Sequence, residues 1–187
     1  MEVAPDELTI RQASSEDVEP LYDVLVKCGL DMRDRLGLTH WVPAYPRGLF
    51  EEHIEKGMVF EEHIEKGMVY SVEVRGGEPV ATFTAGCDAP HYLDLSLWLN
   101  DAEPSLYLTQ LAVSPKLQRR GIGRACIAAV ERLALEHGYR SIRLDAAEAH
   151  AELLDWYLDL GYRESCRYEA FGTRMVGFEK LVSTEAT

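Results

Sequence analysis

The residues best suited to chemistry lie in one short turn, Gln118-Arg119-Arg120-Gly121-Ile122-Gly123-Arg124. This turn lies between a β-type run (107–115) and an amphipathic run (125–139). Glycines at the start of a helix leave backbone N–H groups bare, because no Cβ keeps a ligand away. Such a helix start binds phosphate or pyrophosphate. Since three arginines add positive charge beside it, the sequence predicts an anion site at this turn.

A dinucleotide-binding fingerprint is an alternative interpretation of the same turn. Gly121 and Gly123 follow a strand, and Asp145 lies about twenty residues further on, where that fingerprint has an acid. However, Cys126 replaces the third glycine, and residues 114–120 separate the strand from Gly121, where the fingerprint needs a tight turn. The nucleotide loop GxxxxGK[ST] is absent from the sequence as well. These departures count against a dinucleotide.

The elements that must position the turn indicate an α+β fold. The expected order is a strand (8–14), a helix (18–28), a hairpin (68–86), a strand (107–115), a helix (125–139), a strand (139–146), a helix (149–160) and two strands (162–170, 173–182). We predict a mixed, mostly antiparallel sheet flanked by helices, an α/β/α arrangement. One right-handed strand–helix–strand crossover, residues 107–145, carries the glycine turn.

Two connections are candidates for substrate recognition. Residues 30–49 hold two prolines and two glycines around Trp41 and Tyr45, which predicts a loop or a broken helix after a helix end at Cys28-Gly29. Residues 87–105 form a long connection rich in aromatic and acidic side chains, and connections of this length are more often functional than idle.

A decapeptide, FEEHIEKGMV, occurs twice in tandem at 50–59 and 60–69. Ten residues at about 100° each fall roughly 80° short of three helical turns, so both copies cannot present the same face of one helix. The second copy leads directly into a strand. We therefore expect the second copy to occupy the core position and the first to be an added turn, helix extension or loop. We expect His53 and His63, as duplicates, to be solvated rather than metal ligands.

Length and composition limit the classes of protein. The chain of 187 residues suits a single domain, residues 1–187, with a core of 8–182. A net charge of −13 disfavours nucleic acid and anionic membranes, and it suits a cationic substrate or simply aids solubility. The four cysteines lack the spacing of a metal site. Without a recognisable signal peptide or membrane span, we expect a cytoplasmic protein with reduced thiols and no metal.

Two segments resemble the GCN5-related N-acetyltransferases (GNAT). LAVSPKLQRRGIGRACIAAVERLA (111–134) is similar to the acetyl-CoA motif of that family, Gln/Arg-x-x-Gly-x-Gly/Ala after a strand that ends in Val. DWYLDLGYRE (155–164) is similar to its second signature, Tyr-x-x-x-Gly-Phe, with Tyr in place of Phe. The resemblance extends over about residues 8–180 and is strongest from 106 to 164.

The resemblance implies a set of site residues. The strand backbone would lie along the pantetheine arm as a peptide-like partner, and the turn would hold the pyrophosphate. Tyr157 aligns with the tyrosine near the thioester sulfur, and His150 stands where the family often has Asn. The implied cofactor-binding residues are Leu111, Ala112, Val113, Gln118, Arg119, Arg120, Gly121, Ile122, Gly123, Arg124 and His150.

These parts suit acyl transfer from acetyl-CoA to a primary amine of a small molecule or protein, by direct attack in a ternary complex. An alkylamine has a pKa of about 10.4 and a thiol one of about 8.5, so a base must remove the amine proton and Tyr157 can supply one to sulfur. Glu73, His91, Asp94, Glu103 or a water chain are candidate bases.

A non-catalytic acyl-CoA-binding or regulatory domain of the same fold is the alternative function. The identity of the acceptor amine stays open at the sequence level, and so does the oligomeric state, although homodimers are common in the family.

Overall fold

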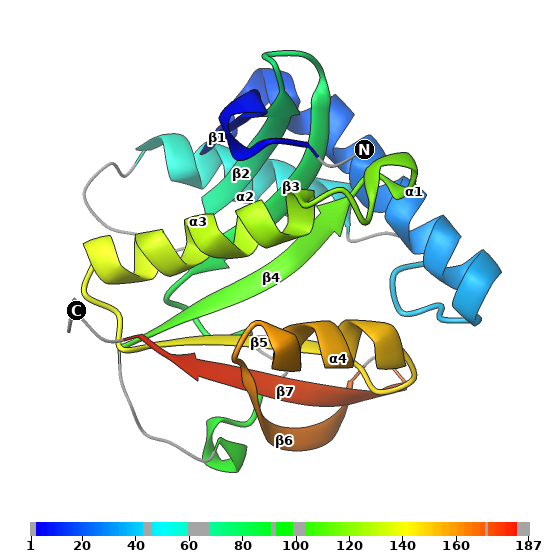
Figure 1. Ribbon diagram of the computed structural model, residues 1–187, viewed down its shortest axis with the longest axis vertical. Helices are drawn as coiled ribbons and strands as arrows, with labels where there is room; N and C mark the ends of the chain where they lie inside the picture. The colour runs from blue at the N-terminus through cyan, green and yellow to red at the C-terminus, as the bar shows by residue number, and fades with distance from the viewer. Residues whose placement is uncertain are drawn as a thin grey trace.

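A seven-stranded mixed sheet forms the centre of the molecule (Figure 1). The computed structural model describes residues 3–42, 46–59, 68–90, 93–98, 104–170 and 172–182. The strands are β1 (Leu8–Gln12), β2 (Met68–Val74), β3 (Pro79–Gly86), β4 (Ser105–Val113), β5 (Ser141–Ala147), β6 (Arg163–Ala170) and β7 (Thr173–Leu181). Their order across the sheet is β1-β2-β3-β4-β5-β7-β6, and β4 and β5 are parallel whereas the other neighbours are antiparallel. The predicted fold class is confirmed.

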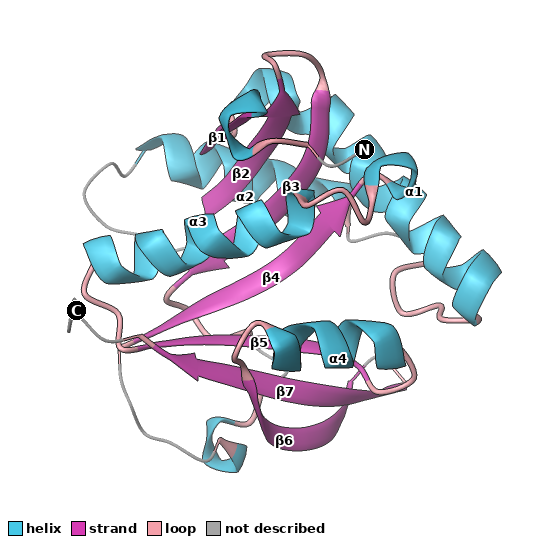
Figure 2. Cartoon of the chain, in the orientation of Figure 1, coloured by secondary structure: helices cyan, strands magenta, loops and turns pink. Residues whose placement is uncertain are grey.

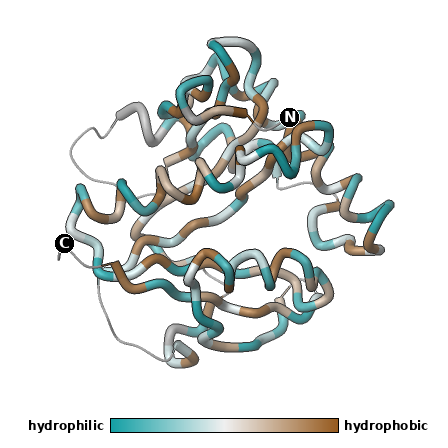
Figure 3. Tube along the Cα trace, in the orientation of Figure 1, coloured by the Kyte–Doolittle hydropathy of each residue, from teal (hydrophilic) through white to brown (hydrophobic). Residues whose placement is uncertain are grey.

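Four α-helices cover the two faces of this sheet. They are α1 (Val18–Leu36), α2 (Arg47–Val59), α3 (Ile122–Glu136) and α4 (Ala151–Asp159). Figure 2 shows α3 and α4 in front of the sheet and α1 and α2 behind it. Along α3, apolar and polar residues alternate at helical spacing, as the brown and teal bands in Figure 3 show, and the buried positions include Ile122, Cys126 and Val130.

The two faces have separate apolar cores. On the side of α3 and α4, the strand residues Phe83, Leu106 and Leu144 pack with the buried side of α3. On the side of α1 and α2, the buried residues are Ala13, Leu21, Val24, Leu25, Cys28, Phe50, Ile54, Val69 and Ala112. Because strand side chains alternate between faces, β2 and β4 contribute to both cores, through Val72 and Leu106 on one side and Val69 and Ala112 on the other.

Strands β4 and β5 part soon after they begin. They pair at Ser105 with Ser141, Leu106 with Ile142 and Tyr107 with Arg143, and at no later residue of these two fully described strands. Figure 1 shows the two strands diverging from their shared start. The β5-facing edge of β4 beyond Tyr107 therefore lies open to a partner other than a strand. We call this opening the fork.

Helix α1 continues well beyond the stop expected at Cys28-Gly29. It ends at Gly37, whose φ of 69° is the left-handed conformation that closes many helices. Gly29 serves packing instead, because a Cβ at this position would lie 2.5 Å from the carbonyl oxygen of Trp41. The close approach of Trp41, in the loop after α1, therefore requires glycine at position 29. Such a contact cannot be predicted from the local sequence.

The first copy of the tandem decapeptide is a helix, one of the forms expected, but it belongs to the core rather than being an addition to it. The first copy forms most of α2, and its Phe50 and Ile54 are 0% and 1% exposed in the core beneath α1. Met68 and Val69, the end of the second copy, begin β2 as expected. Residues 60–67 lie outside the described residues, and His63 with them. His53 is half-buried rather than solvated.

Candidate active site

Strand β4 carries a bulge in its pairing with β3, beyond the point where β4 separates from β5. The pairing of β3 with β4 shifts register between Thr82, opposite Ala112, and Thr84, opposite Thr109. Gln110 takes up the extra residue with a φ of 54°, a conformation that non-glycine residues seldom adopt. The Thr84 hydroxyl donates to Gln110 Oε1 at 3.0 Å and holds this side chain. The bulge re-aims the backbone of Leu111 to Val113, which the sequence assigned to the pantetheine arm.

The glycine turn joins the end of β4 to α3. Arg119 and Gly121 have φ angles of 60° and 88°, so the chain reverses direction at these two residues. Gly121 is the N-cap of α3, and its carbonyl accepts from Ala125 at 3.0 Å in the first helical turn. The N–H groups of Ile122, Gly123 and Arg124 thus stand at a helix start, where the partial positive charge favours an anion. This helix start is the place where the sequence predicts an anion site.

The strand end that leads into the turn is held from two sides. The Val113 carbonyl accepts from Gln118 Nε2 at 3.1 Å and from the Cys28 thiol of α1 at 3.0 Å. Burial raises the pKa of Cys28 to about 12, so this thiol stays protonated and can donate. Gln118 therefore braces the turn through its side chain, and this contact differs from the phosphate contact that the sequence suggested for it.

The three arginines of the turn are exposed. Arg119 forms an ion pair of 2.6 Å with Glu152 in the first turn of α4, so it bridges from the glycine turn to the facing helix. The Arg120 carbonyl accepts from the backbone of Val3 at 2.9 Å. The side chains of Arg120 and Arg124 are exposed to solvent, where their guanidinium groups can bind a phosphate of a ligand held at the turn.

Helix α4 contacts the turn through Trp156. The Trp156 ring lies 3.5 Å from the point where a Cβ on Gly123 would stand, which is ordinary contact. Tyr157, the next residue, is 5% exposed and packs against the rings of Tyr162 and Phe178. Burial raises the pKa of Tyr157, and the negative charge of Asp145 raises it further. The hydroxyl therefore stays protonated at neutral pH.

His150 forms the N-cap of α4. Its Nδ1 accepts from the Leu153 N–H at 3.3 Å, a role that Asn also fills well at a helix start. Burial lowers the pKa of His150 and keeps the ring neutral. The pKa of the half-buried His40 is lowered as well, first by burial and then by the proximity of His150. With Nδ1 accepting, the proton of the neutral His150 ring is on Nε2, which can donate to a carbonyl.

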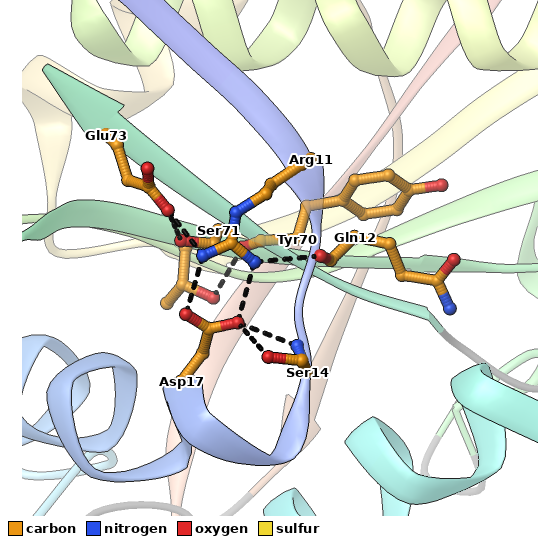
Figure 4. Close-up of polar contacts among 8 residues, drawn as sticks. Arg11, Gln12, Ser14, Asp17, Tyr70, Ser71 and Glu73 are labelled. Atoms are coloured by element: carbon orange, nitrogen blue, oxygen red, sulfur yellow. Dashed lines mark hydrogen bonds and ion pairs between the residues drawn. The ribbon is translucent and has the colours of Figure 1, made fainter. Parts of the chain in front are cut away.

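Two of the candidate bases are engaged elsewhere. Glu73, on β2, accepts from Arg11 at 2.5 Å, and the same guanidinium binds Asp17 at 2.7 and 2.8 Å (Figure 4). This cluster lies two strands away from the fork. Asp94 is exposed, and hydrogen bonds from Ser96 lower its pKa. His91 and Glu103 lie outside the described residues.

Two further residues near the fork had no site assignment from the sequence. Gln110 forms the bulge, and no local pattern signals a positive φ at glutamine. Asp145 lies on β5 just beyond the pairing with β4, and the Tyr168 hydroxyl donates to its Oδ2 at 2.5 Å. The sequence offered Asp145 only as part of an imitation dinucleotide fingerprint.

Searches for other kinds of site gave negative results within the described residues. No three or more His, Cys, Asp or Glu side chains gather there in an arrangement that could hold a metal ion. None of the described helices combines the length and the apolar character needed to cross a membrane.

Comparison with known proteins identifies the class to which this site belongs. The model of the acetyltransferase (GNAT) family matches residues 35–162, and the chain belongs to this family. This finding confirms the resemblance inferred from the two signatures. A search of curated protein sequences gave no match.

Solved structures share the fold over nearly the whole chain. An acetyltransferase of the GNAT family from Listeria monocytogenes is 21% identical, with a TM-score of 0.71 over 93% of this chain and 94% of its own. PaiA N-acetyltransferase from Thermoplasma acidophilum, in complex with coenzyme A, is 13% identical, with a TM-score of 0.68 over 91% and 97%. The ribosomal-protein-S18-alanine N-acetyltransferase from Escherichia coli is 15% identical, with a TM-score of 0.65 over 96% of each chain.

Proposed function

We propose that this protein is an acetyl-CoA-dependent N-acetyltransferase that transfers the acetyl group to a primary amine by direct attack in a ternary complex. The observation that carries the proposal is the fork. Its open β4 edge runs into the glycine turn at one end, and α4, which carries the buried and protonated Tyr157, approaches this turn through the neighbouring Trp156. Membership of the acetyltransferase family supports the same reaction.

The chain's own residues would hold the cofactor along this path. The backbone of Leu111 to Val113 offers strand-type hydrogen bonds to the amide-containing pantetheine arm. The N–H groups from Arg119 to Arg124 bind the pyrophosphate, with Arg120 and Arg124 free of the ion pair that engages Arg119. His150 donates from Nε2 to a pantetheine carbonyl, in the place of the amide that the family often has.

The reaction then needs charge to be moved in two places. As the amine nitrogen bonds to the thioester carbon, negative charge grows on the carbonyl oxygen, and a backbone N–H of the bulged strand can stabilise it. When the carbon–sulfur bond breaks, the thiolate takes a proton. Tyr157, which stays protonated because burial raises its pKa, donates its proton to the departing sulfur. A base takes one proton from the ammonium before attack, and the second proton of the attacking nitrogen returns to the Tyr157 oxygen as the amide forms.

A test of this function uses the purified chain, acetyl-CoA and a panel of alkylamines, amino acids, aminoglycosides and peptides, followed by release of free thiol. Calorimetry measures the acetyl-CoA Kd separately. We expect turnover with at least one amine. In Tyr157→Phe, kcat falls about 100-fold while the acetyl-CoA Kd stays within about twofold.

Two results would change the conclusion. Tight binding of acetyl-CoA without turnover of any amine would favour a non-catalytic acyl-CoA-binding domain. Unchanged kcat in Tyr157→Phe would remove the tyrosine from the mechanism but leave the acetyltransferase function intact.

A further inference from the structure

The N-terminal segment, residues 3–7, lies beside the glycine turn and contacts its backbone (Figure 1). The Val3 N–H donates to the Arg120 carbonyl at 2.9 Å, and the Val3 side chain packs against the apolar core on the α3 side. At its other end, the Glu7 carbonyl accepts from the Arg75 N–H of the β2–β3 hairpin at 2.7 Å, and the Glu7 carboxylate accepts from the Arg75 guanidinium at 2.9 Å. The segment is therefore held at both ends, by the turn and by the hairpin.

The peptide between Arg120 and Gly121 has two accessible orientations. Gly121 has a φ of 88° and a ψ of −13°, close to the values of the third residue in a type II turn. The third residue of a type I turn has a negative φ, and the two turns differ chiefly by a half-rotation of the peptide that precedes this residue. Because glycine adopts either sign of φ, the turn alone does not hold this peptide in one orientation.

The hydrogen bond from Val3 selects one of the two orientations. In a planar trans peptide, the carbonyl and the N–H of the next residue point in opposite directions. Since the Arg120 carbonyl points toward Val3, the Gly121 N–H points away from the N-terminal segment. A flipped peptide would present the carbonyl oxygen where the N–H now points. That side of the turn would then offer an acceptor instead of a donor.

We propose that Val3 is a positioning residue of the cofactor site. By holding the Arg120 carbonyl, its N–H aims the Gly121 N–H at the coenzyme A pyrophosphate, beside the N–H groups at the start of α3. This inference rests on the proposed function and extends its cofactor site to a segment that is remote in the sequence. The direction of this one peptide matters because pyrophosphate oxygens accept hydrogen bonds and are repelled by a carbonyl oxygen.

The test separates the N–H of Val3 from its side chain. Val3→Pro removes the donor, since proline has no backbone N–H, whereas the matched control Val3→Ala keeps the donor and shortens the side chain. Calorimetry measures the Kd of coenzyme A. We expect Val3→Pro to bind coenzyme A about tenfold more weakly, the effect of one hydrogen bond to a charged group, and Val3→Ala to stay within about threefold of the wild type.

Pantetheine, which has no phosphate group, distinguishes a lost phosphate contact from a general disturbance of the site. An NMR titration measures its Kd. We expect this Kd to stay within about twofold of the wild type in both variants, because the strand edge that receives pantetheine does not depend on the Gly121 N–H. A variant whose fold is damaged would lose affinity for both ligands, and urea unfolding measures the stability of each variant.

A second variant removes the donor without introducing proline. Replacing Val3 by its α-hydroxy acid puts an ester oxygen in place of the N–H and keeps the side chain, and a synthetic segment 1–27 that carries it can be ligated at Cys28. We expect the same loss of about tenfold for coenzyme A. The 1H–15N resonance of Gly121, identified by its absence from Gly121→Ala, should move on addition of coenzyme A in the wild type and in Val3→Ala, and stay still in Val3→Pro.

Three results would overturn the positioning role of Val3. They are equal coenzyme A affinity in Val3→Pro and Val3→Ala, equal weakening of coenzyme A and pantetheine in Val3→Pro, and a Gly121 resonance that coenzyme A does not move in the wild type. All these measurements follow binding. A chain that shows the expected differences but acetylates no amine would therefore support the role of Val3 and reject only the proposed reaction.

Discussion

The two glycines of the turn have different physical reasons to be glycine. Gly121 has a φ of 88°, where any Cβ is strained. Gly123 lies within α3 and has room for a methyl group, since a Cβ there would touch Trp156 at 3.5 Å. Alanine is in fact the better helix former at such a position. The anion site therefore depends on the first glycine for its shape and on the second only for close approach.

We predict that Gly121→Ala weakens acetyl-CoA binding by at least about tenfold and lowers the free energy of unfolding by about 1 to 2 kcal/mol, because the turn must hold a strained residue. Gly123→Ala is the matched control. It should be as stable as the wild type or more stable, with a Kd within about threefold. Calorimetry and urea unfolding measure both quantities. Equal behaviour of the two variants would contradict this division of roles.

At this scale local spacing along the sequence predicts the residues of the proposed cofactor site, whereas nothing in the local sequence indicates where Gln110 and Asp145 lie. Tyr157 lies on the second helix after the turn of Gln118 to Arg124, with one strand between the two helices. This regular order makes the two motifs recognisable in the sequence. Asp145 acquires its place only because β4 leaves β5 after Tyr107, and Gln110 only because β3 imposes a register shift. Both depend on pairing between distant segments, which single positions in a sequence do not report.

Among the elements, α2 shows how a repeated segment can serve two structures. The first decapeptide supplies the helix with Phe50 and Ile54, and the second supplies Met68 and Val69 at the start of β2. The two copies are identical, so the sequence could not say which one the helix would use. Deleting residues 50–59 and deleting residues 60–69 give the same polypeptide.

We predict that this shortened chain folds and binds acetyl-CoA with a Kd within about twofold. Its single copy still offers a helix face with Phe and Ile, followed by Gly and a strand start, and a shorter connection costs less closure entropy. Urea unfolding should differ by less than about 1 kcal/mol. As a control in the full chain, Phe50→Ala should cost about 3 to 5 kcal/mol. Loss of soluble protein on deletion would show that the additional ten residues are structural.

The entry into α1 is secured by an ionic cluster that joins three elements. Arg11 on β1 binds Asp17, at the N-cap of α1, and Glu73 on β2, as Figure 4 shows. Asp17 also accepts from the Ser14 N–H and hydroxyl. The hydrogen bond from Arg11 is the largest of the effects that lower the pKa of Asp17 from 3.8 to about 2. The carboxylate is thus stabilised in the folded state.

A lowered pKa in the folded state contributes stability above the unfolded pKa, and this contribution is lost as the pH falls through the folded value. We predict that Asp17→Asn loses about 1 to 2 kcal/mol at pH 7, a value reduced by solvent around the half-exposed Arg11. Between pH 4 and pH 2 the difference from the wild type should shrink toward zero. Urea unfolding at several pH values measures it, with exposed Glu16→Gln as control. A difference independent of pH would point to lost packing rather than lost charge.

Over the whole molecule, the fork divides the sheet into two parts, β1 to β4 and β5 to β7. The two parts meet through the three residue pairs of β4 and β5. The side chains that span this junction come from β4, β5 and β7. Arg143 of β5 binds Tyr107 of β4 and Glu179 of β7, and Trp98 covers its guanidinium with the ring centroid 5.1 Å away. This buried group therefore connects the part of the sheet that leads into the glycine turn to the part formed by β5 to β7.

Removing one partner of the buried Arg143–Glu179 ion pair should destabilise the protein more than removing both partners. We predict that Arg143→Met lowers the free energy of unfolding by about 3 to 5 kcal/mol, because Glu179 is then buried without its cation, and that adding Glu179→Met restores most of the loss. Arg163→Met, an exposed arginine on the neighbouring edge strand, should change stability by less than about 0.5 kcal/mol. Urea unfolding completes the double-mutant cycle.

The activity of the double variant separates two roles of the pair. If the pair only stabilises the sheet, the double variant regains acetyl transfer together with its stability. If the pair also sets the width of the fork, kcat stays low although the stability returns. We expect the second result, since Tyr107 loses the hydrogen bond from Arg143 at the last residue pair before β4 and β5 separate. An Arg143→Met variant as stable as Arg163→Met would show that the two parts of the sheet are joined by other contacts.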